Sequence, residues 1–169
     1  MKRKNIFGHV PGTSNPMDAA LQFLGYRART VREVERYLDG KQYGEFEVAQ
    51  VIDRLLELGL LDDERFAGDF VESRLRTKPV SRRHLREQLY GHELPAETIE
   101  RALQAVDEET ERKNAALVAE KYWRQFEALP DRDRCGRVMQ RLLGRGYDAE
   151  LARSIIRALD EEGYGEETP

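Results

Sequence analysis

The chain repeats one pattern of apolar positions three times, and mostly polar residues separate the copies. Each copy has two apolar residues four apart, then a glycine two residues later, then a Tyr or Leu three residues after the glycine. The copies are Val34, Leu38, Gly40 and Tyr43; Leu85, Leu89, Gly91 and Leu94; and Val138, Leu142, Gly144 and Tyr147. Apolar residues four apart share one face of a helix, so each copy predicts a helix that ends near its glycine. The glycines predict left-handed C-terminal caps.

Each of these helices has a predicted helix on either side of it. A second apolar stripe, at helical spacing, follows each copy, and a further amphipathic segment precedes it. The preceding segments are residues 16–25, 63–76 and 110–127. Thr30 and Ser81 stand in the N-cap position of the first two repeated helices, and Thr30 with Glu33 matches a capping box. Each copy therefore predicts a unit of three helices.

The predicted fold class is all-α, with three tandem three-helix repeats. The repeats span residues 16–61, 62–108 and 109–163, between a flexible N-terminal tail, residues 1–15, and a frayed C-terminus, residues 164–169. Three units that each contact mainly their neighbours predict an elongated body.

Composition and motifs exclude several classes of function but do not identify one. The 28 basic and 32 acidic residues give a net charge of −4, so any attraction to nucleic acid has to be local. Apolar runs are too short to cross a membrane, no secretory signal is predicted, and the single cysteine, Cys135, fits a reducing cytoplasm. Neither a metal-ligand cluster nor a catalytic or phosphate-binding motif is present in the sequence, which predicts a protein that is not an enzyme and has no cofactor.

Two basic runs are the candidate binding residues. The first has no acidic residue and comprises Arg74, Arg76, Lys78, Arg82, Arg83 and Arg86. The second includes Arg134 and three residues that continue its spacing along one predicted helical face, Arg137, Arg141 and Arg145. Arginine outnumbers lysine, which suits bidentate contact with phosphates or carboxylates. The alternative is that both runs are solvated helix faces.

Two other groups of residues have structural explanations. Asp62 and Asp63 stand at the N-terminus of a predicted helix, where carboxylates accept hydrogen bonds from free N–H groups, and this explanation is stronger than a metal site. Tyr122, Trp123 and Phe126 share a helical spacing that fits core packing better than stacking on bases.

The segment 59–67, which contains Asp62, Asp63, Arg65 and Phe66, resembles the signature of RecX, the bacterial regulator of the RecA recombinase. The segment 85–89 with the basic residues before it, and the repeated turn of glycine followed by a basic residue, resemble the same family. The resemblance covers about residues 17–160, and it implies that the signature residues are mainly structural.

The resemblance also implies a function and a partner. RecX proteins form a curved body of three-helix repeats that lodges in the groove of RecA filaments on single-stranded DNA. There they inhibit ATP hydrolysis, strand exchange and the co-protease activity, and thereby modulate recombination, DNA repair and the SOS response. The expected partner is the RecA filament, with single-stranded or duplex DNA as a further partner, and the chain is expected to be a monomer. The alternative is a helix-turn-helix-like DNA-binding protein.

Overall fold

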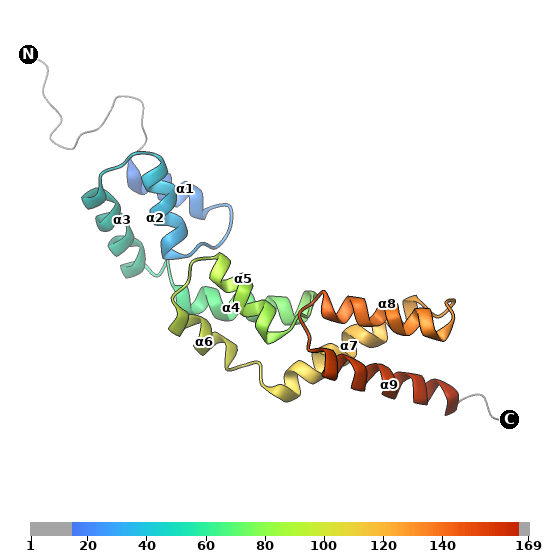
Figure 1. Ribbon diagram of the computed structural model, residues 1–169. Coiled ribbons are helices and arrows are strands. Elements are labelled where there is room, and N and C mark those ends of the chain that lie inside the picture. Colours follow the sequence, from blue (N-terminus) through green and yellow to red (C-terminus); the bar gives the residue numbers. More distant parts are fainter. Residues whose placement is uncertain (1–14, 166–169) are drawn as a thin grey trace, which may run out of the picture. The chain divides into compact units, whose positions relative to one another are not determined.

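The computed structural model describes residues 15–165, with side chains through residue 161, and these residues form helices without any strand. The described helices are α1 (Pro16–Leu24), α2 (Val31–Gly40), α3 (Glu45–Glu57), α4 (Asp63–Thr77), α5 (Arg82–Gly91), α6 (Ala96–Leu103), α7 (Glu108–Gln125), α8 (Asp131–Leu143) and α9 (Ala149–Gly165) (Figure 1). The predicted all-α fold is therefore confirmed for this part of the chain.

The sequence predicts a flexible tail and a frayed segment at the two ends of the chain. All but one residue of the predicted tail lies outside the described residues; the exception, Asn15, accepts a hydrogen bond from the Met17 N–H at 3.0 Å and caps α1. Of the predicted frayed segment, α9 includes the part up to Gly165, and residues 166–169 lie outside the described residues.

The described chain divides into two compact units. The first unit runs to Phe66 and includes His92–Leu94; the second comprises Ala67–Gly91 and the chain from Pro95 onward. In the first unit α1, α2 and α3 pack on one another around a core of aliphatic side chains, with Leu38 and Leu55 fully buried. None of the described helices is long and apolar enough to cross a membrane.

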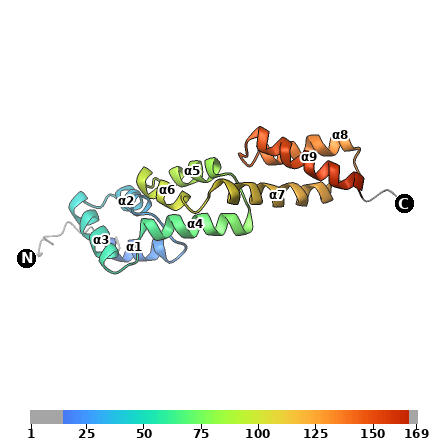
Figure 2. The ribbon, with the colours of Figure 1, turned by 90° about the horizontal axis from the view of Figure 1, so that it is seen from below.

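The second unit has a larger core. Helices α7, α8 and α9 lie side by side in both views (Figure 2) and bury Trp123, Leu142 and Tyr147 among their apolar faces. Helix α5 packs on α6, and Leu85 and Leu89 are fully buried there. Trp123 is thus a core residue, as predicted, whereas Tyr122 and Phe126 are partly buried and pack against this core.

The helix starts agree with the sequence. Thr30 accepts a hydrogen bond from the Glu33 N–H at 3.2 Å, and the Glu33 carboxylate accepts one from the Thr30 N–H, so the capping box before α2 is confirmed. Ser81 Oγ likewise accepts a hydrogen bond from the His84 N–H at 3.1 Å and caps α5. Both N-caps are buried, which makes their hydrogen bonds part of the core.

The predicted left-handed glycines are wrong by two residues. Helices α2 and α5 end on Gly40 and Gly91, and Gly144 after α8 has φ of −64°. In the turns after α2, α5 and α8 the left-handed residues are instead Gln42, Glu93 and Gly146, with φ of 64°, 58° and 83°. The helical conformation continues through the glycine, and the chain reverses afterwards.

This reversal of the chain explains why the last position of each repeated copy is a Tyr or a Leu. The Tyr43 N–H donates to the Leu38 carbonyl at 3.4 Å, and the Tyr147 N–H donates to the Leu142 carbonyl at 3.3 Å. A hydrogen bond of this span around a left-handed residue forms a Schellman motif, in which the residue after the turn packs back on the helix. Tyr147 is accordingly almost fully buried.

Candidate functional site

A basic cleft of about 480 Å³ lies in the second unit. Four cations line it: Arg74 in α4, Lys78 just after that helix, Arg141 near the end of α8, and Arg145 in the turn that follows α8. The rest of the lining comprises Val80, His84, Gln88, Tyr122 and Gly144. The structure thus brings together two cations from each of the basic runs, and no lining residue is acidic.

The turn after α8 is held against the start of α5. The Ser81 N–H donates to the Arg145 carbonyl at 3.0 Å. A Cβ on Gly146 would lie 2.5 Å from Ser81 Oγ and 3.0 Å from the Cβ of His84. Because Gly146 is also left-handed, glycine is required here for both its conformation and its size. This close approach places Arg145 at the cleft.

The first unit contains the same kind of contact. Thr30 Oγ1 donates to the carbonyl of His92 at 2.8 Å, and His92 Nδ1 lies 2.9 Å from the Glu33 carboxylate. His92 and Arg145 occupy the same column of the sequence repeat, and so do Thr30 and Ser81. His92 after Gly91 and Arg145 after Gly144 therefore each belong to a turn that contacts the N-cap of a helix in the same unit.

The two arginines at the edge of the cleft share one aromatic ring. Arg145 Nη2 donates to the Tyr122 hydroxyl at 2.8 Å, and Arg145 Nη1 donates to the Arg141 carbonyl at 3.2 Å. The guanidinium carbons of Arg145 and Arg141 lie 5.0 and 5.2 Å from the centre of the Tyr122 ring. Burial raises the pKa of Tyr122, but the Arg145 hydrogen bond and the nearby positive charges outweigh it and leave the pKa lowered.

The cations of the basic cleft have no acidic partner in the part of the chain that the structure describes. None of the four lies within 4.0 Å of an Asp or Glu carboxylate there. Arg145 Nε and Gln88 Oε1 are also buried without a hydrogen-bond partner among those residues. The cleft therefore presents positive charge that the described protein leaves uncompensated.

The other members of the first basic run have carboxylate partners. Arg86 makes two hydrogen bonds to Glu100, of 2.6 and 3.0 Å, and Arg82 lies 3.7 Å from the same carboxylate. The bonds from Arg86 hold the pKa of Glu100 below its usual range. Arg83 lies 4.0 Å from Glu87. The run is free of acids in sequence, but folding brings acids to these three members.

The members of the second basic run have different surroundings and do not form one continuous basic face. Arg134 stacks on Trp123, 4.0 Å from the ring centre, and its Nε donates to the Trp123 carbonyl at 3.0 Å. Arg137 is exposed and lines a different hollow, together with Asp133. Arg145 follows α8 and is not part of it. Arg76, from the first run, is exposed on α4.

The signature residues lie in the first unit, at the start of α4. Asp62 Oδ1 accepts a hydrogen bond from the Arg65 N–H at 2.9 Å, and Asp63 Oδ1 accepts one from the Val31 N–H at 2.9 Å. Burial raises the pKa of Asp63 above its usual value. The ring of Phe66 meets His92 edge-on, with 5.0 Å between the ring centres. Both aspartates are therefore engaged with helix N-termini.

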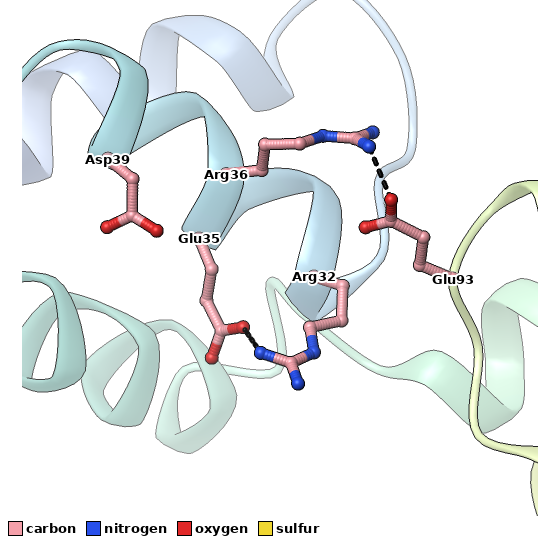
Figure 3. A pocket seen from close by; sticks show the side chains of 5 residues that line it. All are labelled: Arg32, Glu35, Arg36, Asp39 and Glu93. Carbon is pink, nitrogen blue, oxygen red and sulfur yellow. Dashed lines mark hydrogen bonds and ion pairs between the residues drawn. The ribbon is translucent and has the colours of Figure 1, made fainter.

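The first unit has a hollow of its own, which carries charges of both signs. Arg32, Glu35, Arg36, Asp39 and Glu93 line it (Figure 3). Arg32 pairs with Glu35 at 2.9 Å, and Arg36 pairs with Glu93. Four of the five charges pair with one another and the fifth, Asp39, is acidic, so this hollow lacks the uncompensated positive charge of the basic cleft. Among the described residues, no group of three or more His, Cys, Asp and Glu is placed to hold a metal ion.

Sequence reasoning did not find three residues of the basic cleft, Tyr122, His84 and Gln88. The spacing of Tyr122 with Trp123 and Phe126 predicts a core position, whereas its hydroxyl contact with Arg145 joins α7 to a turn that is distant in the sequence. The only sequence signal for His84 is its place within the first basic run. Nothing in the sequence indicates Gln88.

Comparison with known proteins covers nearly the whole described chain. Family models for the first, second and third three-helix domains of RecX match residues 17–55, 62–103 and 109–156. The Regulatory protein RecX of Mycolicibacterium vanbaalenii is 34% identical over 168 residues, covering 88% of this chain and 91% of the relative. The Regulatory protein RecX of Chlorobaculum tepidum is 35% identical over 150 residues, covering 88% and 91%.

The solved structures agree with the sequence comparisons. The crystal structure of RecX from Lactobacillus salivarius superposes with a TM-score of 0.72 at 25% identity, and the match covers 86% of this chain and 94% of that one. The three tandem three-helix domains predicted from the sequence are thus those of a known family. With all three domains matched in order, the chain belongs to the RecX family of regulatory proteins.

Proposed function

We propose that this chain binds RecA filaments on single-stranded DNA and inhibits the ATPase, strand-exchange and co-protease activities of RecA. The observation that carries the proposal is the presence of all three RecX three-helix domains, in order, in one chain. In this role the chain regulates recombination and DNA repair by binding and not by catalysis, and it acts as a cytoplasmic monomer.

Repetition of the domains supports a filament as the partner. A filament presents the same surface at every subunit, and a chain with three related domains is able to contact several such surfaces at once. Linked contacts make each later binding event intramolecular, so that weak individual contacts sum to a high overall affinity. The proposed role therefore needs no single deep binding pocket.

The basic residues supply the candidate contacts. Of the nine cations proposed from sequence, the four in the basic cleft and the exposed Arg76 and Arg137 have no described carboxylate within pairing distance. Arg82, Arg83 and Arg86 are exposed or half-buried beside Glu100 and Glu87, which weakens their attraction for a further anion. We propose that the cleft makes the strongest contact and that the other cations add to it.

The test is the ATPase rate of RecA on single-stranded DNA, with the purified chain added after the filament has formed. The rate should fall as the chain is added, and the chain alone should hydrolyse no ATP. An unchanged rate at equimolar chain contradicts the proposal.

A further inference from the structure

The basic cleft holds like charges together at a free-energy cost. Arg74, Lys78, Arg141 and Arg145 surround a volume of about 480 Å³, and no carboxylate among residues 15–161 lies within pairing distance of them. Like charges around a hollow repel one another more strongly than charges fully in water, because the protein wall has a lower dielectric constant. A bound anion would remove this repulsion.

The arginines are also held in position before any ligand arrives. Arg145 is fixed by its hydrogen bonds to the Tyr122 hydroxyl and the Arg141 carbonyl, and both guanidinium groups lie near the Tyr122 ring. The lowered pKa of Tyr122 reports the same positive field. Side chains that are already ordered lose little entropy on binding, so this arrangement favours a specific contact over a diffuse one.

The polar groups beside the cations indicate what else a ligand carries. Gln88 Oε1 is buried and accepts no hydrogen bond from the described residues, and Arg145 Nε donates none. Buried polar atoms are nearly always paired, so these two match a ligand that has acceptor oxygens and also a donor. A nucleotide has both, in its phosphate oxygens and in its base N–H groups.

We propose that the basic cleft is a phosphate-binding site, in which Lys78, Arg141 and Arg145 contact phosphate oxygens while Arg74 supplies further positive charge. Guanidinium groups match the geometry of phosphate oxygens. Four cations without an acid suit a ligand with several adjacent negative charges. Two sources have this chemistry: consecutive phosphodiesters of a single strand, and a small polyphosphate. The inference rests on the proposed function for its setting, since a RecA filament encloses a single strand.

The test uses the full chain without RecA, so that its failure is separate from failure of the proposed function. Binding of a fluorescently labelled oligodeoxythymidine is measured by anisotropy over a range of salt concentrations. The double variant Lys78→Gln/Arg141→Gln should bind roughly tenfold more weakly, since it loses two charge contacts in a cleft open to solvent and each such contact changes the affinity about threefold. Its slope of log affinity against log salt should be shallower by about 1.4, or roughly 0.7 for each lost phosphate contact.

A matched control removes the same charge elsewhere. Arg153 and Arg157 are exposed on α9 and do not line the cleft, so Arg153→Gln/Arg157→Gln should keep the parent affinity and salt slope. Equal weakening by the two double variants would mean diffuse attraction over the whole surface and would overturn the proposal. Circular dichroism checks that both variants keep the parent helix content.

A measurement on the parent chain removes the dependence on variants. Tripolyphosphate is titrated while the Nε–H resonances of Arg141 and Arg145 are followed by NMR. These resonances should move, and that of Arg86, which is bonded to Glu100, should not. If the oligonucleotide also moves them, a strand is the source, and if tripolyphosphate alone does so, a small polyphosphate is the source. Unmoved Arg141 and Arg145 resonances with both ligands, or equal competition by polyglutamate, would refute the phosphate assignment.

Discussion

Gly146 offers a test of the contact that builds the basic cleft. Its φ of 83° is left-handed, and a Cβ at this position would lie 2.5 Å from Ser81 Oγ. We predict that Gly146→Ala destabilises the chain through both features. The turn would have to move away from Ser81, which would strain or break the hydrogen bond between the Ser81 N–H and the Arg145 carbonyl.

The magnitude follows from these two costs. A left-handed backbone costs a residue with a Cβ roughly 1–2 kcal/mol. Forcing an extra methyl group into a packed site costs about 1–3 kcal/mol, and a shift that breaks the hydrogen bond costs a similar amount. The free energy of unfolding should therefore fall by roughly 2–5 kcal/mol, which lowers Tm by about 4–20 °C for a chain of this size.

Gly91→Ala is the matched control. Gly91 is the last residue of α5, its φ is not left-handed, and a Cβ there would meet nothing within 4 Å. Alanine favours helix, so Tm should stay the same or rise slightly. Both variants are compared with the parent by thermal melts followed by circular dichroism. Equal changes of Tm in the two variants, or no change for Gly146→Ala, would refute the assigned left-handed position and the close approach.

Three further predictions concern stability. Leu89→Ala should lower the free energy of unfolding in urea by about 2–5 kcal/mol, because Leu89 is fully buried, whereas Leu117→Ala on an exposed position should change it by less than about 0.5 kcal/mol. Thr30→Ala should cost about 1–2 kcal/mol by the same measurement, because it removes a buried N-cap, and Thr30→Ser should restore most of the loss. Hydrogen bonds from the Glu150 and Leu151 N–H groups lower the pKa of Asp148, so its contribution to stability is present above the ordinary value of 3.8 and is lost as the pH falls through the lower folded-state value. Asp148→Asn keeps an N-cap without the charge, and unfolding measured from pH 5 to pH 2 should then depend less on pH; an identical acid profile would contradict the assignment.

Most of the fold can be predicted from the apolar positions that repeat along the sequence. Helix faces follow from spacing within a few residues, so the pairs such as Leu85 and Leu89, and the caps at Thr30 and Ser81, are visible in the sequence. The left-handed positions are not, because Gln42 and Glu93 occupy two of them and only Gly146 has the residue type expected there. Gly40, Gly91 and Gly144, two residues earlier, are the stronger sequence signal, but they mark the end of each helix and not the left-handed position.

The basic cleft depends on contacts that spacing does not determine. Arg141 and Arg145 meet Arg74 and Lys78 because the turn after α8 packs on the start of α5, which is a contact between distant segments. The pairing of Arg86 with Glu100 likewise follows from the packing of α5 on α6. A run of basic residues therefore predicts the charge of a region, and the fold decides which members remain uncompensated.

The most direct test of the account compares three proteins as inhibitors of the RecA ATPase on single-stranded DNA at physiological salt. They are the parent chain, Lys78→Gln/Arg141→Gln in the basic cleft, and the control Arg153→Gln/Arg157→Gln. The cleft variant should need on the order of tenfold more protein for half-inhibition, because it loses two charge contacts in a cleft open to solvent, while the control matches the parent. Equal inhibition by all three proteins would contradict the claim that the basic cleft makes the strongest contact in the inhibition of RecA.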